Sequence, residues 1–288
     1  MQNSNILKLK HDLVGNSLPS DCASLELRLE KGDLIYPSWS PDSYFNSDEL
    51  QAICSYKTKG LWHQAISFYP DSGKLVGSNS KEIERFLGRI SKDLTDKMQV
   101  LLPMYSGAIR LDRVVLNNVE VATSGGKNLF KDDVLHLDTL KGGLPNEKRL
   151  IKLCCNINPT NTRVWEKGPS LASLLMDGRA RDELFLKSKL GLYQNNFKND
   201  FTSMLEHIGN LIRQSELIQE KIPRKVVVFP AKSFWLAMTD VCIHSTLRGG
   251  NVLELMFFVQ EHALCSGDLS APCLLRSFFS SEIKQIAA

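Results

Sequence analysis

The sequence lacks the features of several common protein classes. No apolar run approaches the roughly 18 residues of a membrane-spanning helix, and residues 1–5 show neither the apolar core nor the cleavage site of a signal peptide. The net charge of +3 is too small to indicate a nucleic-acid partner, although local basic clusters can meet an anionic substrate or a membrane surface. We therefore expect a cytoplasmic protein that binds no nucleic acid and at most touches the inner face of the cytoplasmic membrane.

Disulfide patterns and the common hydrolase and dehydrogenase motifs are also missing. The seven cysteines, an odd number, form no C-x-x-C pair and are typical of reduced thiols. The chain contains no G-x-S-x-G, no G-x-G-x-x-G after a strand and no H-E-x-x-H. These absences disfavour hydrolase and dehydrogenase functions.

What is present is an ordinary globular composition with a β-rich second half. Of the 288 residues, 43% are hydrophobic and 23% are charged, which suits one domain over residues 1–288 with a sizeable core. After residue 105, short β-prone runs bounded by turn residues outnumber helical patterns. These runs are residues 109–122 (two strands around Asn117-Asn118), 150–158, 162–165, 225–229, 234–244 and 252–259. The pattern predicts a mainly β protein of barrel type with flanking helices.

Three further patterns lie outside these strands. Alternating charged and apolar residues over 25–30 predict a strand. Asn79 and Glu82 form a capping box that opens a helix, whose apolar stripe is typical of a face packed on a sheet. Residues 200–220 predict an amphipathic helix inserted outside the barrel, and His207 on it is expected to be a packed or surface side chain.

One histidine and one aspartate stand two residues apart in the expected strand 130–138. On a strand, His136 and Asp138 point to the same side. Two such ligands and a distant histidine make the 2-His-1-carboxylate set that holds non-haem Fe(II) with open coordination positions. His244, before the turn at Gly249-Gly250, is the candidate third ligand, and His207 and His262 are the alternatives. A His-x-Asp pair by itself is also common in surface loops.

Several short segments together resemble the Kdo 3-hydroxylase family. They are Lys131-Asp132-Asp133 running into His136-Leu137-Asp138, then residues 156–159 with residues 162–165, Phe229-Pro230, Thr239-Asp240 and Leu253-Glu254. Members of this family are Fe(II)- and 2-oxoglutarate-dependent oxygenases that act on an inner-core sugar of lipopolysaccharide. The resemblance implies a double-stranded β-helix (jelly-roll) core over 105–262 with a helical insertion at 170–222, between an N-terminal α/β region, 1–104, and a C-terminal extension, 263–288.

The same resemblance implies the roles of the site residues. His136, Asp138 and His244 would hold Fe(II), and 2-oxoglutarate would chelate the iron through its keto-acid end. Many related enzymes bind the far carboxylate with an Arg about ten residues after the distal histidine, but position 254 is Glu254. Arg163 is therefore the preferred anchor, because a guanidinium binds a carboxylate in a bidentate manner. Asn156 is a candidate for supporting the same ligand or for a purely structural role, and Arg248 is the alternative anchor.

The implied substrate is the Kdo sugar on a lipid A precursor, hydroxylated at C3 with O2 to give Ko. Its carboxylate and phosphates require cations, and the basic residues nearest in sequence to the metal strand are Arg110, Lys127, Lys131 and Lys141. Two other functions stay open: an oxygenase of the same type acting on another small molecule or a protein, and a cupin-like metal- or sugar-binding protein without turnover. Only an oxygenase would convert 2-oxoglutarate to succinate. A homo-oligomer is compatible with the sequence.

Overall fold

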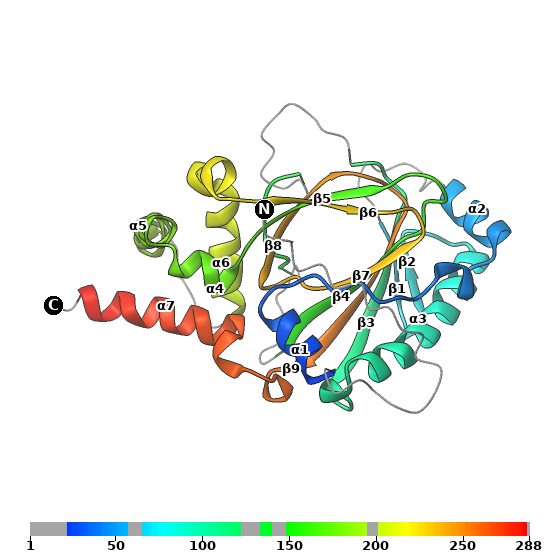
Figure 1. Ribbon diagram of the computed structural model, residues 1–288, viewed down its shortest axis with the longest axis horizontal. Coiled ribbons are helices and arrows are strands. Elements are labelled where there is room, and N and C mark those ends of the chain that lie inside the picture. The colour runs from blue at the N-terminus through cyan, green and yellow to red at the C-terminus, as the bar shows by residue number, and fades with distance from the viewer. Residues whose placement is uncertain (1–21, 57–64, 122–132, 140–147, 195–200, 287–288) are drawn as a thin grey trace.

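The computed structural model describes residues 22–56, 65–121, 133–139, 148–194 and 201–286, in which two antiparallel β-sheets face each other around a common interior (Figure 1). The six-stranded sheet has the order β2 (Lys74–Val76), β1 (Ile66–Tyr69), β3 (Ile109–Asn117), β9 (Val252–Gln260), β4 (Lys148–Asn156) and β7 (Ser233–Met238). The three-stranded sheet has the order β6 (Lys225–Phe229), β5 (Arg163–Ser170) and β8 (Cys242–Arg248). From β6 to β9 the chain alternates between the two sheets, and the two facing sheets confirm the predicted jelly-roll with flanking helices.

The strand register gives the large sheet an outer and an inner face. Leu153 of β4 is paired with Leu255 of β9 and with Leu236 of β7, and these residues belong to the main hydrophobic core. The next position, Cys154, is paired with Trp235 and points to the opposite side, into a smaller cluster between the sheets. Because side chains alternate along a strand, every second residue of β9, β4 and β7 therefore faces the interior.

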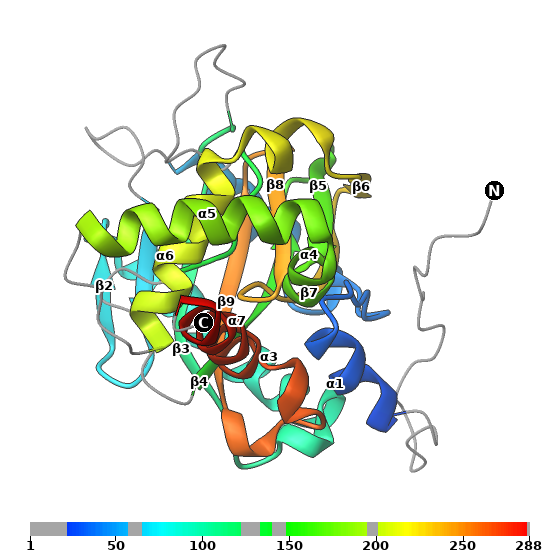
Figure 2. The same ribbon diagram turned by 90° about the vertical axis from the view of Figure 1, so that its left-hand side faces the viewer.

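Helices cover the outer face and one end of the barrel (Figures 1 and 2). The helix α3 (Lys81–Leu101) buries its apolar stripe in the main core beside β1 and β3. Between β5 and β6 lie α4 (Leu171–Met176), α5 (Gly178–Gln194), α6 (Phe201–Gln214) and the π-helical turn η3 (Leu217–Lys221), and α7 (Ala271–Ile286) packs beside α6. The remaining elements are α1 (Cys22–Glu30), η1 (Pro41–Ser43), α2 (Ser47–Ser55), η2 (Pro103–Tyr105), η4 (Glu261–Ala263) and η5 (Gly267–Leu269). The amphipathic helix predicted at 200–220 is confirmed by α6.

The strand predicted at 25–30 was wrong, because these residues belong to the helix α1. Two acidic side chains of this helix, Glu26 and Glu30, are buried although they are charged residues. Glu30 accepts hydrogen bonds from the Tyr105 hydroxyl (2.7 Å) and from the main-chain N–H groups of Cys265 (2.7 Å) and Ser266 (2.8 Å). The buried face of α1 is therefore partly polar. For this reason, the spacing of its apolar residues alone does not show the helical period.

Two smaller expectations were also wrong at their boundaries. The cap of α3 is Ser80, whose hydroxyl accepts a hydrogen bond from the Ile83 N–H at 3.3 Å, and not Asn79. The second strand expected after Asn117 does not form in residues 118–121. Instead, the Asn118 amide donates hydrogen bonds to two carbonyl groups at the end of α2.

A fully buried ion pair joins β4 to the turn before β8. Arg149 and Asp240 are both completely buried, and the Arg149 Nη2 atom lies 2.6 Å from Asp240 Oδ2. Asp240 Oδ2 also accepts a hydrogen bond from the Leu150 N–H at 3.0 Å. The adjacent Thr239 carbonyl accepts a hydrogen bond from the Asp138 N–H at 3.0 Å. The ion pair thus stabilises the turn that holds the main chain of Asp138.

We expect the substitution Asp240→Asn to lower the free energy of unfolding by about 3–5 kcal/mol, because it leaves the Arg149 charge buried without a partner. Urea unfolding of the metal-free protein measures this change. The double variant Arg149→Met/Asp240→Leu is the matched control, since removing both charges together is expected to cost less than removing one. Equal stability of Asp240→Asn and the wild type would contradict a structural role of the ion pair.

Candidate metal centre

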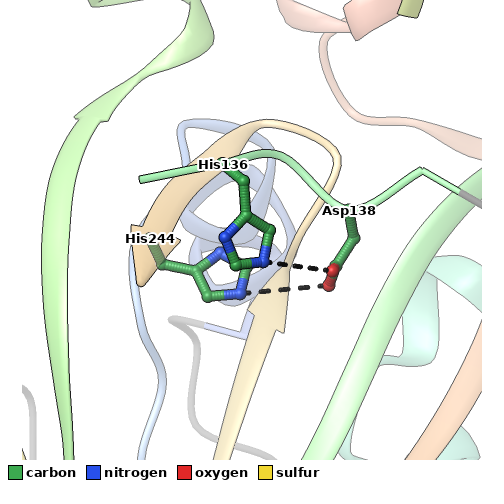
Figure 3. Close-up of side chains that lie close together, drawn as sticks. All are labelled: His136, Asp138 and His244. Carbon is green, nitrogen blue, oxygen red and sulfur yellow. Dashed lines mark ion pairs between the residues drawn. The ribbon is translucent and has the colours of Figure 1, made fainter. Parts of the chain in front are cut away.

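Three predicted ligands meet inside the barrel. His136, Asp138 and His244 each offer one ligand atom, and these atoms all lie within 4.8 Å of one another. The His136 Nε2 atom is 3.7 Å from Asp138 Oδ1, and the His244 Nε2 atom is 4.0 Å from Asp138 Oδ2 (Figure 3). Within the described ranges, this is the one cluster of at least three His, Cys, Asp or Glu side chains with the geometry of a metal site.

Main-chain pairing fixes the two imidazoles next to each other. His136 and His244 exchange two main-chain hydrogen bonds, from His136 N to His244 O at 2.9 Å and from His244 N to His136 O at 3.0 Å. The pairing is an isolated bridge, so the continuous strand expected over 130–138 is not present in its described part, residues 133–138. The extended backbone at His136 nevertheless puts its side chain on the same side as that of Asp138 (Figure 3).

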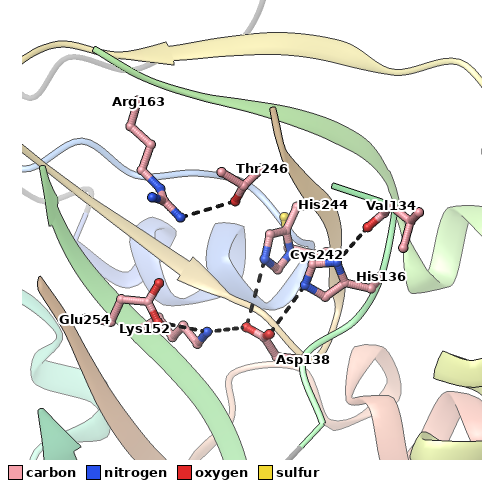
Figure 4. Close-up of polar contacts among 9 residues, drawn as sticks. All are labelled: Val134, His136, Asp138, Lys152, Arg163, Cys242, His244, Thr246 and Glu254. Carbon is pink, nitrogen blue, oxygen red and sulfur yellow. Dashed lines mark hydrogen bonds and ion pairs between the residues drawn. The ribbon is translucent and has the colours of Figure 1, made fainter. Parts of the chain in front are cut away.

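Hydrogen bonds on the far side of each ring orient the ligand atoms. The His136 Nδ1 atom lies 2.8 Å from the Val134 carbonyl oxygen, and the His244 Nδ1 atom lies 2.9 Å from the Cys242 carbonyl oxygen (Figure 4). A carbonyl can only accept, so each Nδ1 carries the hydrogen and each Nε2 keeps its lone pair for a metal. The ring of Trp165 stacks on His244, with ring centroids 4.5 Å apart, and thereby restricts its rotation.

The electrostatics favour the protonation states that bind a metal. Burial lowers the pKa of His136 to about 3, and the neighbouring His244 acts in the same direction. Burial also lowers the pKa of His244. Burial alone would raise the pKa of Asp138, but the charge of the Lys152 ammonium outweighs burial and holds that pKa below its ordinary value. Two neutral imidazoles and one carboxylate are the donor set of a mononuclear Fe(II) site.

A buried lysine that the sequence analysis did not single out lies beside the carboxylate ligand. Lys152 Nζ is 2.8 Å from Asp138 Oδ2 and 3.2 Å from Glu254 Oε2 (Figure 4). Burial would lower the pKa of Lys152, but the carboxylates of Asp138 and Glu254 raise it above its ordinary value. The signal in the sequence was a single charged residue within the apolar run 150–155. Glu254 therefore serves as the partner of Lys152.

Arg163 lies on the same side of the barrel interior as His244. It is buried, donates from Nη1 to the Gly249 carbonyl at 2.7 Å and from Nη2 to the Thr246 hydroxyl at 3.3 Å, and Thr246 follows His244 by two residues on β8 (Figure 4). Within the described residues, the buried Arg163 Nε, Trp165 Nε1 and Trp235 Nε1 atoms have no hydrogen-bond acceptor. Buried donors normally have acceptors. A dicarboxylate next to His244 would supply them, so the interior fits 2-oxoglutarate.

The other predicted contacts lie elsewhere or make different bonds. The Asn156 amide donates to the Asn161 carbonyl in the β4–β5 connection at 2.9 Å and to the carbonyls of Phe229 and Pro230 at the end of β6. Its role in cosubstrate binding stays a prediction. Arg248 is exposed, and its Nη2 atom reaches Thr162 Oγ1 at only 3.5 Å. Arg110 is exposed near the start of β3. Three predicted lysines lie outside the described residues: Lys127, Lys131 and Lys141. The alternative ligands His207, on α6, and His262, on η4, are not part of the cluster.

A jelly-roll with a buried His-x-Asp pair and a distant histidine defines a class, the non-haem Fe(II)- and 2-oxoglutarate-dependent dioxygenases. Within this class, the chain belongs to the 3-deoxy-D-manno-oct-2-ulosonic acid (Kdo) hydroxylase family, whose model matches residues 16–280. The resemblance inferred from the short sequence segments is thereby confirmed.

Solved structures of a Kdo hydroxylase, KdoO, share the fold. The apo form of KdoO has 20% sequence identity to the chain and a TM-score of 0.75, with 92% of each chain covered. A cobalt(II) complex of KdoO has 21% identity and a complex with α-ketoglutarate and Fe(III) has 20%, each with a TM-score of 0.75 and 92% coverage of both chains. No curated protein sequence matches the chain.

We expect the substitution Lys152→Met to weaken Co(II) or Fe(II) binding by roughly 10- to 100-fold, the usual effect of removing a group that orients a metal ligand. Without the ammonium, the Asp138 carboxylate loses its nearest cation and binds a proton more readily. Metal titration of the purified protein measures the change. In the matched control Glu254→Gln, Lys152 keeps its ion pair with Asp138, so a smaller effect is expected. Tighter metal binding by Lys152→Met would show instead that the ammonium opposes the metal.

Proposed function

We propose that the protein is an Fe(II)- and 2-oxoglutarate-dependent dioxygenase that hydroxylates C3 of Kdo carried on a lipid A precursor, which gives Ko. The observation that carries this proposal is the largely buried cluster of His136, Asp138 and His244 in a chain of the Kdo hydroxylase family. Fe(II) bound with 2-oxoglutarate would supply the oxidative chemistry, in which one oxygen atom of O2 enters the C–H bond and the other enters succinate as CO2 leaves.

The contributions of the chain itself are geometry, charge and exclusion of water. His136 and His244 would bind the metal through Nε2, with their tautomers set by the carbonyls of Val134 and Cys242. Asp138 would supply the negative charge and the third ligand. All three side chains are largely or completely buried, so bulk water has little access to the metal. A metal held by these three side chains would keep open coordination positions for the cosubstrate and O2.

Arg163 would bind the far carboxylate of 2-oxoglutarate. Two of its terminal nitrogens already hold fixed positions, on the Gly249 carbonyl and the Thr246 hydroxyl, so the guanidinium is oriented before any ligand enters. The indole N–H groups of Trp165 and Trp235 would donate to the same dicarboxylate, which accounts for their lack of acceptors among the described residues. The buried carboxylate of 2-oxoglutarate would then have a cationic partner and hydrogen-bond donors, without which its burial would be costly.

The substrate would be met at the cytoplasmic face of the inner membrane. Among the described residues, no helix has both the length and the apolar character to cross a bilayer. A lipid-borne sugar would therefore be reached by peripheral contact of basic residues with anionic headgroups. Such contact weakens as ionic strength rises.

The test is an assay of the purified protein with Fe(II), 2-oxoglutarate and O2. With the Kdo-bearing lipid we expect succinate and a lipid product heavier by one oxygen atom. Unrelated acceptors, tested in parallel, decide between the proposal and an oxygenase acting on another small molecule or protein. A Kdo lipid that gains no oxygen while another acceptor does would contradict the substrate. A protein that binds metal but never forms succinate would support the cupin-like alternative.

A further inference from the structure

A row of inward-facing side chains crosses the large sheet from β3 to β4. Arg113 of β3 is paired with Met256 of β9, and Met256 is paired with Lys152 of β4. Directly opposed residues of antiparallel strands point to the same side of a sheet. Lys152 reaches the interior, since it contacts Asp138 (Figure 4). Arg113 therefore lies on the inner face as well, two strand spacings or roughly 10 Å from Lys152 at the backbone.

A β-bulge determines the direction of Arg113. The pairing of β3 with β9 shifts register between Leu111 and Arg113, which leaves Asp112 without an opposed residue. Bulges re-aim side chains and are frequent beside active sites. Without the bulge, residue 113 would keep its parity relative to Leu111 and the two would share a face. With the bulge, Leu111 is opposed to Phe257 and Arg113 to Met256, so the two side chains point to opposite faces.

Among the described residues, the guanidinium of Arg113 has no strong hydrogen-bond partner. Its Nε donates to the thioether of Met256 at 3.2 Å, and its Nη1 donates to the Tyr69 hydroxyl at 3.3 Å. The one carboxylate oxygen that pairs with it in the described part of the chain, Asp112 Oδ2, is 3.5 Å from Nε, longer than a strong charge-assisted hydrogen bond. No described residue engages Nη2. By contrast, the buried Arg149 meets a carboxylate oxygen at 2.6 Å.

Arg113 is also accessible to a ligand. Its side chain is 24% exposed, so it is neither sealed in the core nor free in solvent. Its position between the phenol of Tyr69 and the thioether of Met256 restricts its movement, and the Tyr69 ring centroid lies 5.9 Å from the guanidinium carbon. A partly buried, pre-oriented guanidinium with an open edge is suited to bidentate binding of a carboxylate or a phosphate.

We propose that Arg113 binds an anionic group of the substrate, a carboxylate or a phosphate, and thereby selects acidic sugars for the metal centre. The proposal rests on the proposed function, because it takes the acceptor to be an acidic sugar on a phosphorylated lipid. Arg163 and Arg113 then bind different anionic molecules. Arg163, next to His244, takes the cosubstrate, and Arg113, across the sheet from Lys152, takes the substrate.

The experiment compares the wild type with Arg113→Gln on three forms of the Kdo lipid: intact, with the sugar carboxylate as its methyl ester, and with the lipid phosphates removed. We expect Arg113→Gln to raise KM for the intact lipid by roughly 10- to 100-fold, the loss of one hydrogen bond to a charged group. The dissociation constant of 2-oxoglutarate, measured without substrate, should stay unchanged. Arg113→Lys should restore part of the loss, since it keeps the charge but not the bidentate geometry.

The modified lipids identify the anion. The KM penalty of Arg113→Gln should disappear on whichever form lacks the group that Arg113 binds, the ester for a carboxylate and the dephosphorylated lipid for a phosphate. A penalty of equal size on all three forms would overturn the proposal, because it would reflect a structural role. Weaker binding of 2-oxoglutarate in Arg113→Gln, with an unchanged KM for the lipid, would also overturn it.

The matched control is Arg85→Gln, on the helix α3 that covers the outer face of the same sheet. This variant should keep the KM of the wild type, and thermal unfolding of all variants checks that they fold. A wild type that leaves the Kdo lipid unmodified would contradict the proposed function and with it the role of Arg113. Wild-type turnover with an unchanged KM in Arg113→Gln would contradict the role of Arg113 alone.

Discussion

Alanine in place of Asp138 is expected to abolish both hydroxylation and tight iron binding. The substitution removes the only anionic member of the cluster and leaves Lys152 facing two imidazoles and any incoming cation. The loss should exceed the roughly 10- to 100-fold effect expected when only a group behind a ligand is removed. His136→Ala and His244→Ala should have the same consequence, because the 2-His-1-carboxylate site needs all three protein ligands.

Equilibrium binding of Co(II) or Fe(II) under anaerobic conditions measures the affinity, and succinate release measures turnover. The matched controls are His207→Ala and His262→Ala, histidines on α6 and η4 that lie outside the cluster. Both controls should bind metal like the wild type. If His244→Ala kept normal iron affinity while one of the two controls lost it, the third ligand would have to be reassigned.

Leucine in place of Arg163 is expected to weaken 2-oxoglutarate binding by roughly 30-fold or more, with little change in metal affinity. Removing one member of a buried, hydrogen-bonded charge pair costs about 2–5 kcal/mol, and about 1.4 kcal/mol corresponds to a factor of ten in Kd. Glu254 does not offer an alternative anchor, because its carboxylate would repel the dicarboxylate and is already paired with Lys152 at 3.2 Å.

Anaerobic titration of the metal-loaded protein with 2-oxoglutarate measures this effect. Arg248→Leu is the matched control, because Arg248 is an exposed arginine whose one described hydrogen bond, to Thr162, is 3.5 Å long. Arg163→Lys should bind with intermediate affinity, since one ammonium replaces a planar fork of donors. Unchanged affinity in Arg163→Leu beside a loss in Arg248→Leu would move the anchor to Arg248. Thermal unfolding of Arg163→Leu separates weaker binding from the loss of its bond to the Gly249 carbonyl.

The local sequence pattern was sufficient to predict a helix or a strand where the spacing of apolar residues and the residue types indicated the same element. The apolar stripe of α3 and the face of α6 repeat at helical spacing, and both helices form where the pattern predicts them. The strands β4, β6 and β9 follow from β-branched and apolar runs between turn residues. The spacing of His136 and Asp138 was enough to predict two side chains on one side of an extended segment, because that depends on local backbone geometry alone.

Contacts between distant segments decided the structures that the local pattern did not predict. The helical period of α1 is hidden because Glu26 and Glu30 are buried beside hydrogen-bond donors some 75 to 235 residues away, which no local window contains. These donors are the Tyr105 hydroxyl and the main-chain N–H groups of Met104 and Cys265. The segment 136–138 pairs with β8 by the single bridge between His136 and His244 and does not form a continuous strand. The position of β8 in the assembled sheet determines this pairing, and the local sequence of the segment does not.

The sequence by itself therefore determined the β-rich class and the candidate ligands His136, Asp138 and His244, because residue type and spacing carry that information. Only the tertiary structure placed Lys152 between Asp138 and Glu254, and only the bulge in β3 turned Arg113 toward the interior. A charged residue in a strand has the same local pattern whether it faces solvent or a catalytic chamber. Its face and its partners are set by the register between strands, which is a property of the assembled sheet.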